Sequence, residues 1–175
     1  MHGRIEDGAL VSDELPALRL QPGPGFEYRG SCELEIAGIA LAARHHFLDE
    51  GSSRLLVVQL EHFTVPDRAY SFELQDPVEL AGEPYARMAF ELRVAEEIAE
   101  NPGREVETSV AHLLQEGVRL PDRHAVARFA RICGPEHRHE IIVFVHEYAA
   151  GAPLDGILDR ALTAFRLEPL AAPRA

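Results

Sequence analysis

The alternation of apolar and polar side chains in residues 26–36, which read FEYRGSCELEI, is the feature that most constrains the fold. Successive side chains of an extended strand project to opposite sides of a sheet. The segment therefore predicts a strand with one buried and one solvated face. The apolar set is Phe26, Tyr28, Cys32, Leu34 and Ile36, and the polar set is Glu27, Arg29, Ser31, Glu33 and Glu35.

Two further apolar segments, 39–48 and 54–63, flank the sequence DEGSS, which is typical of a hairpin loop. If all five of these residues form the loop, residue 48 faces residue 54. His46 and His62 would then lie on the same face, about 20 Å apart, too far to share a metal. Segment 69–74, AYSFEL, predicts a fourth strand, so that residues 26–74 form an antiparallel meander.

Residues 84–100 fit both a helical and a strand period, and their many Ala, Glu, Leu and Arg residues favour a helix. Segment 104–117 predicts a second helix, and 153–166, with one continuous apolar stripe, predicts the clearest helix of the chain. Segments 123–133 and 139–148 flank GPEHR as a second hairpin. The predicted fold class is therefore α+β: an antiparallel β-sheet, a meander plus a C-terminal hairpin, with helices packed on one face.

The 175 residues suit one folded unit with a substantial core. Residues 26–168 are expected to form a single α+β domain. Residues 1–25, which end in QPGPG and show no periodicity, are expected to be a loosely ordered N-terminal arm. Residues 169–175 are expected to be a C-terminal tail.

The formal net charge of −12 argues against nucleic acid or an anionic membrane as a partner, because both would repel such a surface. The longest apolar runs are far too short to cross a bilayer. Residues 1–20 contain acidic residues and lack a continuous apolar segment, so no secretory signal is evident and a cytoplasmic location is expected. The acidic charge is compatible with a basic protein partner.

The histidine-rich stretch 134–148, GPEHRHEIIVFVHEY, offers the one candidate metal site. Thiolate and imidazole groups suit Zn²⁺, and Cys133, His137 and His139 could supply them at the end of the second hairpin. His146 has the opposite parity and lies roughly 23 Å from His139 along an extended strand, so it cannot join them. The alternative interpretation is a polar loop before a buried strand, with no metal and no other cofactor.

Motifs for nucleophilic catalysis, phosphate binding and dinucleotide binding are absent from the sequence, so no catalytic residue is predicted. The leading hypothesis is a non-enzymatic binding or accessory module, chaperone-like, that engages a protein partner or self-associates as a homo-oligomer through a sheet edge such as 69–74. The alternative hypothesis is a metal- or small-ligand-binding protein that uses Cys133, His137 and His139. A cavity between the sheet and the last helix is a third possibility.

The order of predicted elements in residues 32–63, followed by helix, hairpin and closing helix, resembles the small acidic type III secretion chaperones. That resemblance implies a dimer that binds unfolded effector segments, although this chain lacks their N-terminal helix. Separately, the closing half, from LLQEGVRL to LDGILDRALTAFRL, is similar to the end of PsbP/Mog1-like domains. Neither resemblance carries a motif, and a fold alone does not fix a function.

Overall fold

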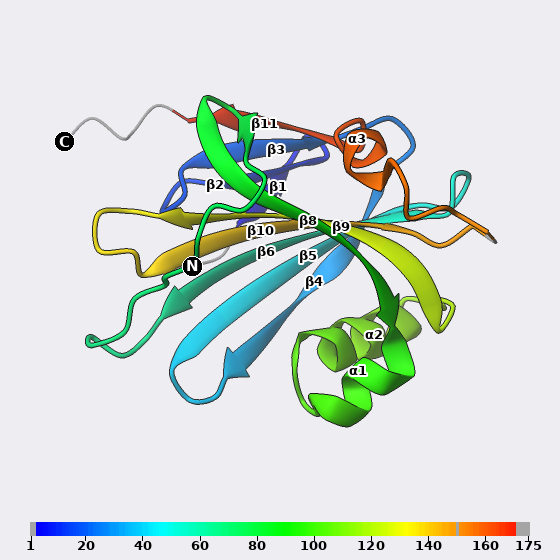
Figure 1. The fold of residues 1–175 in the computed structure, drawn as a ribbon, viewed down its shortest axis with the longest axis horizontal. Helices are drawn as coiled ribbons and strands as arrows, with labels where there is room; N and C mark the ends of the chain where they lie inside the picture. Colours follow the sequence, from blue (N-terminus) through cyan, green and yellow to red (C-terminus); the bar gives the residue numbers. More distant parts are fainter. Residues whose placement is uncertain (1–2, 150, 171–175) are drawn as a thin grey trace.

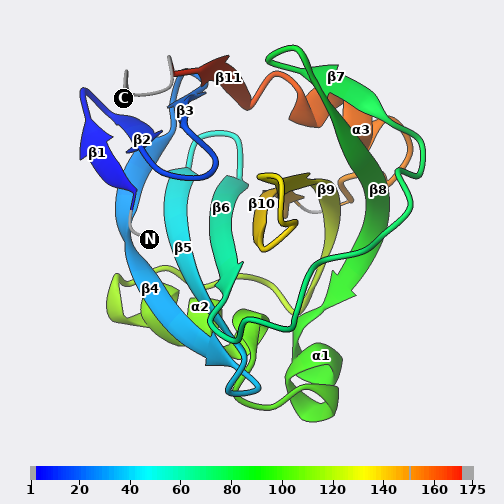
Figure 2. The same ribbon diagram turned by 90° about the vertical axis from the view of Figure 1, so that its left-hand side faces the viewer.

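The computed structural model describes residues 3–149 and 151–170. Seven antiparallel strands form one curved sheet, the main sheet, in the order β4-β5-β6-β10-β9-β8-β7 (Figure 1). Figure 2 shows β4 and β8 on opposite sides of the molecule, with the other long strands between them. The strands are β4 (Glu27–Ile36), β5 (Ala40–Asp49), β6 (Arg54–Phe63), β7 (Val78–Leu80), β8 (Glu83–Arg93), β9 (Arg123–Cys133) and β10 (His139–Glu147). The predicted antiparallel sheet is confirmed, and its β9–β10 hairpin lies between β6 and β8.

A second, four-stranded sheet covers one face of the main sheet, which we call the covered face. It consists of β1 (Arg4–Glu6), β2 (Ala9–Ser12), β3 (Leu18–Pro22) and β11 (Phe165–Pro169). The expectation of a loosely ordered arm at residues 1–25 is therefore wrong for most of that segment. Leu10 and Leu20 are fully buried against Phe47, Leu56 and Phe129 of the main sheet. Burial of this apolar surface orders the segment despite its Pro and Gly residues.

The helices lie on both faces of the main sheet, so the expectation that they pack on one face holds only loosely. α1 (Val94–Glu100) and α2 (Glu105–Gln115) lie against the other face, the open face, near one end of the strands (Figure 1). The short α3 (Ile157–Ala161) packs into the core of the covered face. The protein is thus largely β, with few helical residues.

The predicted helix 153–166 is much shorter than its apolar stripe suggests. Gly156, with φ 71°, stands immediately before α3, and the helix ends at Ala161. The chain then forms β11, whose residues from Phe165 to Pro169 pair with β3. Ile157, Ala161 and Phe165 are all buried, but only the first two lie in the helix. Spacing alone does not reveal this change, because a helix and a turn followed by a strand can bury the same residues.

Residues 84–100 divide between the two structures that their periodicity allows. Residues 83–93 form β8, and the helix begins only at Val94. The prediction of a helix throughout is therefore wrong for the first half. β8 pairs with β9 from Ala86–Ala130 to Arg93–Arg123, and this backbone pairing outweighs the helical propensity of the side chains.

Segment 69–74 is not a strand, contrary to the prediction. It belongs to the connection between β6 and β7 and runs past the β9–β10 turn, where the backbone N–H of Tyr70 donates to the carbonyl of His137 at 2.7 Å. The Tyr70 ring stacks on Phe63, with centroids 4.2 Å apart. The edge on which the hypothesis of a protein partner relied is therefore absent at this segment, and that hypothesis stays a prediction.

The register of the β5–β6 hairpin determines which side chains share the open face. Asp49 pairs with Arg54, so the loop has four residues, 50–53, and not five. The Asp49 carboxylate accepts the backbone N–H of Ser52 at 3.2 Å and closes this shorter loop. A slip of one residue changes every pair of facing side chains. His46 consequently pairs with Val57, and His62 lies on the opposite face from His46.

The predicted C-terminal tail, 169–175, falls mainly on residues 171–175, which lie outside the described residues. Pro169 belongs to β11, and the backbone N–H of Leu170 donates to the carbonyl of Ala17 at 3.1 Å. Among residues 3–149 and 151–170, no helix combines the length and the apolar character needed to cross a membrane.

Candidate functional site

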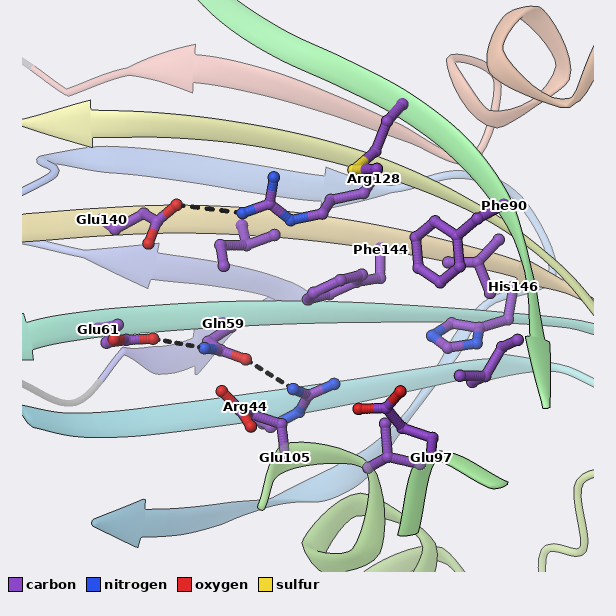
Figure 3. A pocket seen from close by; sticks show the side chains of 15 residues that line it. Arg44, Gln59, Glu61, Phe90, Glu97, Glu105, Arg128, Glu140, Phe144 and His146 are labelled. Atoms are coloured by element: carbon purple, nitrogen blue, oxygen red, sulfur yellow. Dashed lines mark hydrogen bonds and ion pairs between the residues drawn. The ribbon is translucent and has the colours of Figure 1, made fainter. Parts of the chain in front are cut away.

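The open face of the main sheet forms the floor of a pocket of about 540 Å³, which we call the open-face pocket (Figure 3). Strands β5, β6, β10, β9 and β8 supply the floor, and the first turns of α1 and α2 supply part of the wall. One part of the lining is polar and the other is apolar and aromatic. The residues considered below are Arg44, Gln59, Glu61, Glu97, Glu105, Arg128 and Glu140 on the polar side, and His146, Phe90, Val106, Val126 and Phe144 on the apolar and aromatic side.

A chain of side-chain hydrogen bonds crosses from β5 to β6 at the polar part of the pocket. Arg44 Nη1 donates to Gln59 Oε1 at 2.6 Å, and Gln59 Nε2 donates to Glu61 Oε2 at 2.6 Å (Figure 3). The Tyr70 hydroxyl donates to the other carboxylate oxygen of Glu61 at 2.7 Å. Arg44 and Gln59 face each other in the β5–β6 ladder, which explains why their side chains meet.

Arg44 carries a buried positive charge into the pocket. Its side chain is only 4% exposed, and its guanidinium carbon lies 5.2 Å from the centre of the Phe144 ring. Burial lowers the pKa of Arg44 to about 10, while Glu105, Cys32 and Glu61 oppose that shift. The group therefore remains charged at neutral pH, and its direct side-chain partner, Gln59, is neutral.

Glu61 and Glu140 form a pair of buried carboxyl groups across the β6–β10 ladder. Burial raises the pKa of Glu140 to about 7; Arg128 opposes the rise and Glu61 adds to it. Arg128 Nη2 donates to Glu140 Oε1 at 3.3 Å, although Glu140 faces Ile132 in the ladder and Arg128 lies four residues further along β9. Glu140 therefore exchanges its proton near neutral pH, mainly because burial disfavours its charged form.

His146 lies at the aromatic part of the pocket and is held by a second histidine. His124 Nδ1 lies 3.1 Å from the carbonyl oxygen of Pro121, and His124 Nε2 lies 2.9 Å from His146 Nδ1. Burial lowers the pKa of His124, and it lowers the pKa of His146 still further, well below the usual value. Both imidazoles are therefore neutral at physiological pH.

Two polar atoms at the pocket wall, Arg44 Nε and His146 Nε2, are buried and make no hydrogen bond within the described part of the protein. Both residues are more than nine-tenths buried. Buried polar groups in proteins are nearly always paired, and an unpaired one costs about 1–3 kcal/mol. Both side chains line the open-face pocket.

Helix α2 fixes another histidine of the open face. His46 Nε2 lies 3.0 Å from the hydroxyl oxygen of Ser109, and the His46 ring lies 4.9 Å from that of His112. His112 Nε2 in turn lies 2.9 Å from the carbonyl oxygen of Arg29 in β4. These contacts tie α2 to the main sheet beside the pocket. Burial, reinforced by Arg44, lowers the pKa of His46 to about 3.

This depressed pKa makes folding sensitive to acid. The unfolded chain would bind a proton at His46 below a pH of about 6.5, but the folded chain would not do so until about 3, so stability is lost as the pH falls through that window. When the pH is lowered from 7 to 5, the free energy of unfolding should fall in both proteins. We expect the fall to be about 2 kcal/mol smaller in His46→Gln than in the unsubstituted protein. Urea unfolding at both pH values measures this difference. His137→Gln, in an exposed turn, is the control, and parallel losses in all three proteins would contradict the prediction.

The structure brings together two of the three residues predicted to bind zinc. Cys133 and His139 face each other across the β9–β10 ladder, whereas His137 lies in the turn with φ 53°. His139 stacks instead on His62 of β6, with ring centroids 5.9 Å apart. Burial raises the pKa of the Cys133 thiol to about 11, which disfavours the thiolate that zinc requires. Within 3–149 and 151–170, no group of three or more His, Cys, Asp or Glu residues is placed to hold a metal ion, and the zinc site stays a prediction.

The sequence pattern identified part of the open-face pocket but missed its polar chain. By strand parity Glu140, Ile142, Phe144 and His146 share one face of β10, and all four line the pocket. The same parity separates Arg128 from Arg131 on β9, and only Arg128 lines the open-face pocket. The assumption of a five-residue loop in the β5–β6 hairpin concealed the chain formed by Arg44, Gln59 and Glu61. The sequence feature that could have indicated the shorter loop is Asp49, because an aspartate at the last strand position can accept a backbone N–H of the loop that follows.

Comparisons of the chain with protein-family models, with curated proteins and with solved structures find no match. The chemistry of the open-face pocket is therefore the basis on which its function can be inferred.

Proposed function

We propose that the protein binds a small organic molecule in the open-face pocket. The observation that carries this proposal is a pocket of about 540 Å³ lined by Arg44 and His146, each of which keeps one buried polar atom, Arg44 Nε and His146 Nε2, without a hydrogen-bond partner. A bound molecule that supplies an acceptor to Arg44 and a partner to His146 would remove the cost of leaving both atoms unpaired. Pockets of roughly 300–1,000 Å³ are the usual size for small-molecule sites.

The apolar part of the pocket supports the same function. Phe90 and Phe144 contribute aromatic rings, and Val126 adds an aliphatic surface between their strands. An apolar body placed there would leave water while its polar end meets Arg44 and His146. This division into an apolar surface and a few polar anchors is typical of ligand sites.

The fluorescent dye N-phenyl-naphthylamine is a suitable first probe, because it is uncharged, aromatic and small, and carries one N–H group. We expect its fluorescence to rise on binding to the protein. Val106→Trp, at the first turn of α2, should weaken this binding at least about tenfold by filling the pocket with an indole ring. Fluorescence titration gives the dissociation constants.

Leu41→Trp is the matched control, because Leu41 is 43% exposed on β5 and does not line the pocket. It should leave the affinity for the dye unchanged, and thermal unfolding of both variants checks that each is folded. No rise in fluorescence with the unsubstituted protein would contradict the proposed function. Equal binding by Val106→Trp would place the dye elsewhere and would also contradict it.

A further inference from the structure

The hydrogen bonds of His124 determine which nitrogen of His146 carries its proton. A carbonyl oxygen can only accept, so His124 Nδ1, at 3.1 Å from the Pro121 carbonyl, must carry hydrogen and donate it. The other nitrogen of a neutral His124, Nε2, is then an acceptor. His146 Nδ1, which lies 2.9 Å away, must therefore donate to it. In the neutral His146 ring this leaves Nε2 with a bare, unpaired lone pair, on a side chain that lines the pocket.

The surroundings of His146 disfavour a positive charge at that lone pair. Burial, His124, Arg44 and His46 all act against protonation of the imidazole, in that order of strength. An ammonium group placed against Nε2 would lose its hydration in the same way and would lie near the positive charge of Arg44. Glu97 and Glu105 of the helices also line the pocket, and the Glu61–Glu140 pair lies at its polar end. A carboxylate is disfavoured for a different reason, since it has no hydrogen to give to a lone pair.

The second unpaired atom requires the opposite partner. Arg44 Nε carries a hydrogen and needs an acceptor. Its guanidinium group lies over the Phe144 ring, and that ring lies 6.3 Å from the His146 ring. Arg44 and His146 thus both lie beside the Phe144 ring, at the apolar part of the pocket (Figure 3).

We infer that the ligand of the open-face pocket is an uncharged molecule whose polar end both donates and accepts, as a carboxamide or an alcohol does, joined to an aromatic or aliphatic body. Its N–H or O–H donates to His146 Nε2, and its oxygen accepts from Arg44 Nε. His124 is a positioning residue, because it acts only by fixing the proton of His146 on Nδ1. This inference rests on the proposed function.

The first arm of the test needs no ligand. Long-range ¹H–¹⁵N correlation spectra of the protein labelled at histidine distinguish the two neutral tautomers of each ring. We expect His146 to be neutral, with its proton on Nδ1, throughout the neutral pH range, and the signals missing from His146→Phe assign it. A proton on Nε2 would overturn the inference, whatever the pocket binds.

The second arm uses four probes with one body and different ends: cinnamamide, cinnamyl alcohol, cinnamylamine and cinnamate. At neutral pH the first two are uncharged, the third is a cation and the fourth an anion. We expect the amide and the alcohol to bind at least about tenfold more tightly than the two charged probes. His146→Phe should abolish most of this preference. His124→Phe frees His146 to carry its proton on Nε2, and should lower the ratio of amide to carboxylate affinity.

The outcomes separate the inference from the proposed function. If cinnamate bound most tightly, the charge of Arg44 would dominate, and if cinnamylamine did, the carboxylates would dominate. Either result would overturn the inference of an uncharged ligand but keep the pocket as a binding site. Equal affinities of all four probes would also overturn that inference and keep the binding site. Failure of every probe, together with failure of N-phenyl-naphthylamine, would overturn both.

Discussion

Replacing Leu20 by alanine is expected to lower the free energy of unfolding by about 2–5 kcal/mol, the range for removing a fully buried leucine side chain. Leu20 belongs to β3, in the N-terminal segment that lacks any periodicity in the sequence, yet it is 0% exposed. It lies in one apolar cluster with Phe47 and Phe129 of the main sheet. Urea unfolding followed by circular dichroism measures the loss.

Leu74→Ala provides the matched control, because Leu74 is 49% exposed in the connection between β6 and β7. Its effect should stay within about 0.5 kcal/mol, as for most surface substitutions. If Leu20→Ala were equally harmless, the N-terminal strands would contribute nothing to the core, and the small sheet would not stabilise the covered face.

Replacing Glu140 by glutamine is expected to change how stability depends on pH, with the largest difference above pH 7. The folded-state pKa of Glu140 is raised to about 7 from an ordinary value of 4.5. Between these values the folded chain holds a proton that the unfolded chain releases, so this group contributes less and less stability as the pH rises from 4.5 to 7. The difference of about 2.5 pKa units corresponds to about 3 kcal/mol.

Glutamine keeps the shape of the protonated carboxyl group and cannot ionise. We therefore expect Glu140→Gln to gain up to about 3 kcal/mol over the unsubstituted protein on going from pH 5 to pH 8. Urea unfolding at a series of pH values gives this difference. Glu79→Gln, on exposed β7, is the control. Curves for Glu140→Gln and the unsubstituted protein that stay parallel would show that Glu140 is ionised in the folded state.

The Glu61–Glu140 pair also bears on what the open-face pocket can hold. When Glu140 is protonated it can donate a hydrogen bond, and when it is ionised it adds a second negative charge beside Glu61. The polar end of the pocket therefore changes its charge near neutral pH, whereas His146 at the other end stays neutral. A ligand that spans the pocket would experience this change only at its Glu140 end.

Strand parity predicted the arrangement of β10 because it depends only on local geometry. Alternate residues of any extended strand lie on opposite faces, so Glu140, Phe144 and His146 had to share one side. Their partners could not be derived in the same way. His124 meets His146 only because β9 pairs with β10 in one particular register, in which His146 faces Val126.

The sequence by itself determined the first three strands of the meander, the β9–β10 hairpin, the helix at α2 and the faces of β10, since these follow from the spacing of apolar residues and from turn residues. In β4, a register shift between Tyr28 and Ser31 places Tyr28 and Cys32 on opposite faces, which strict alternation does not predict. Only the tertiary structure decided that residues 4–22 are strands, that 83–93 is a strand and that 157–169 is mostly not helix. In each case the segment pairs its backbone with a strand that is distant in the sequence, or packs its apolar side chains against such a strand. The tertiary structure also decided the open-face pocket. A shift of one residue in the pairing of β5 with β6 determines whether Arg44, Gln59 and Glu61 meet at all.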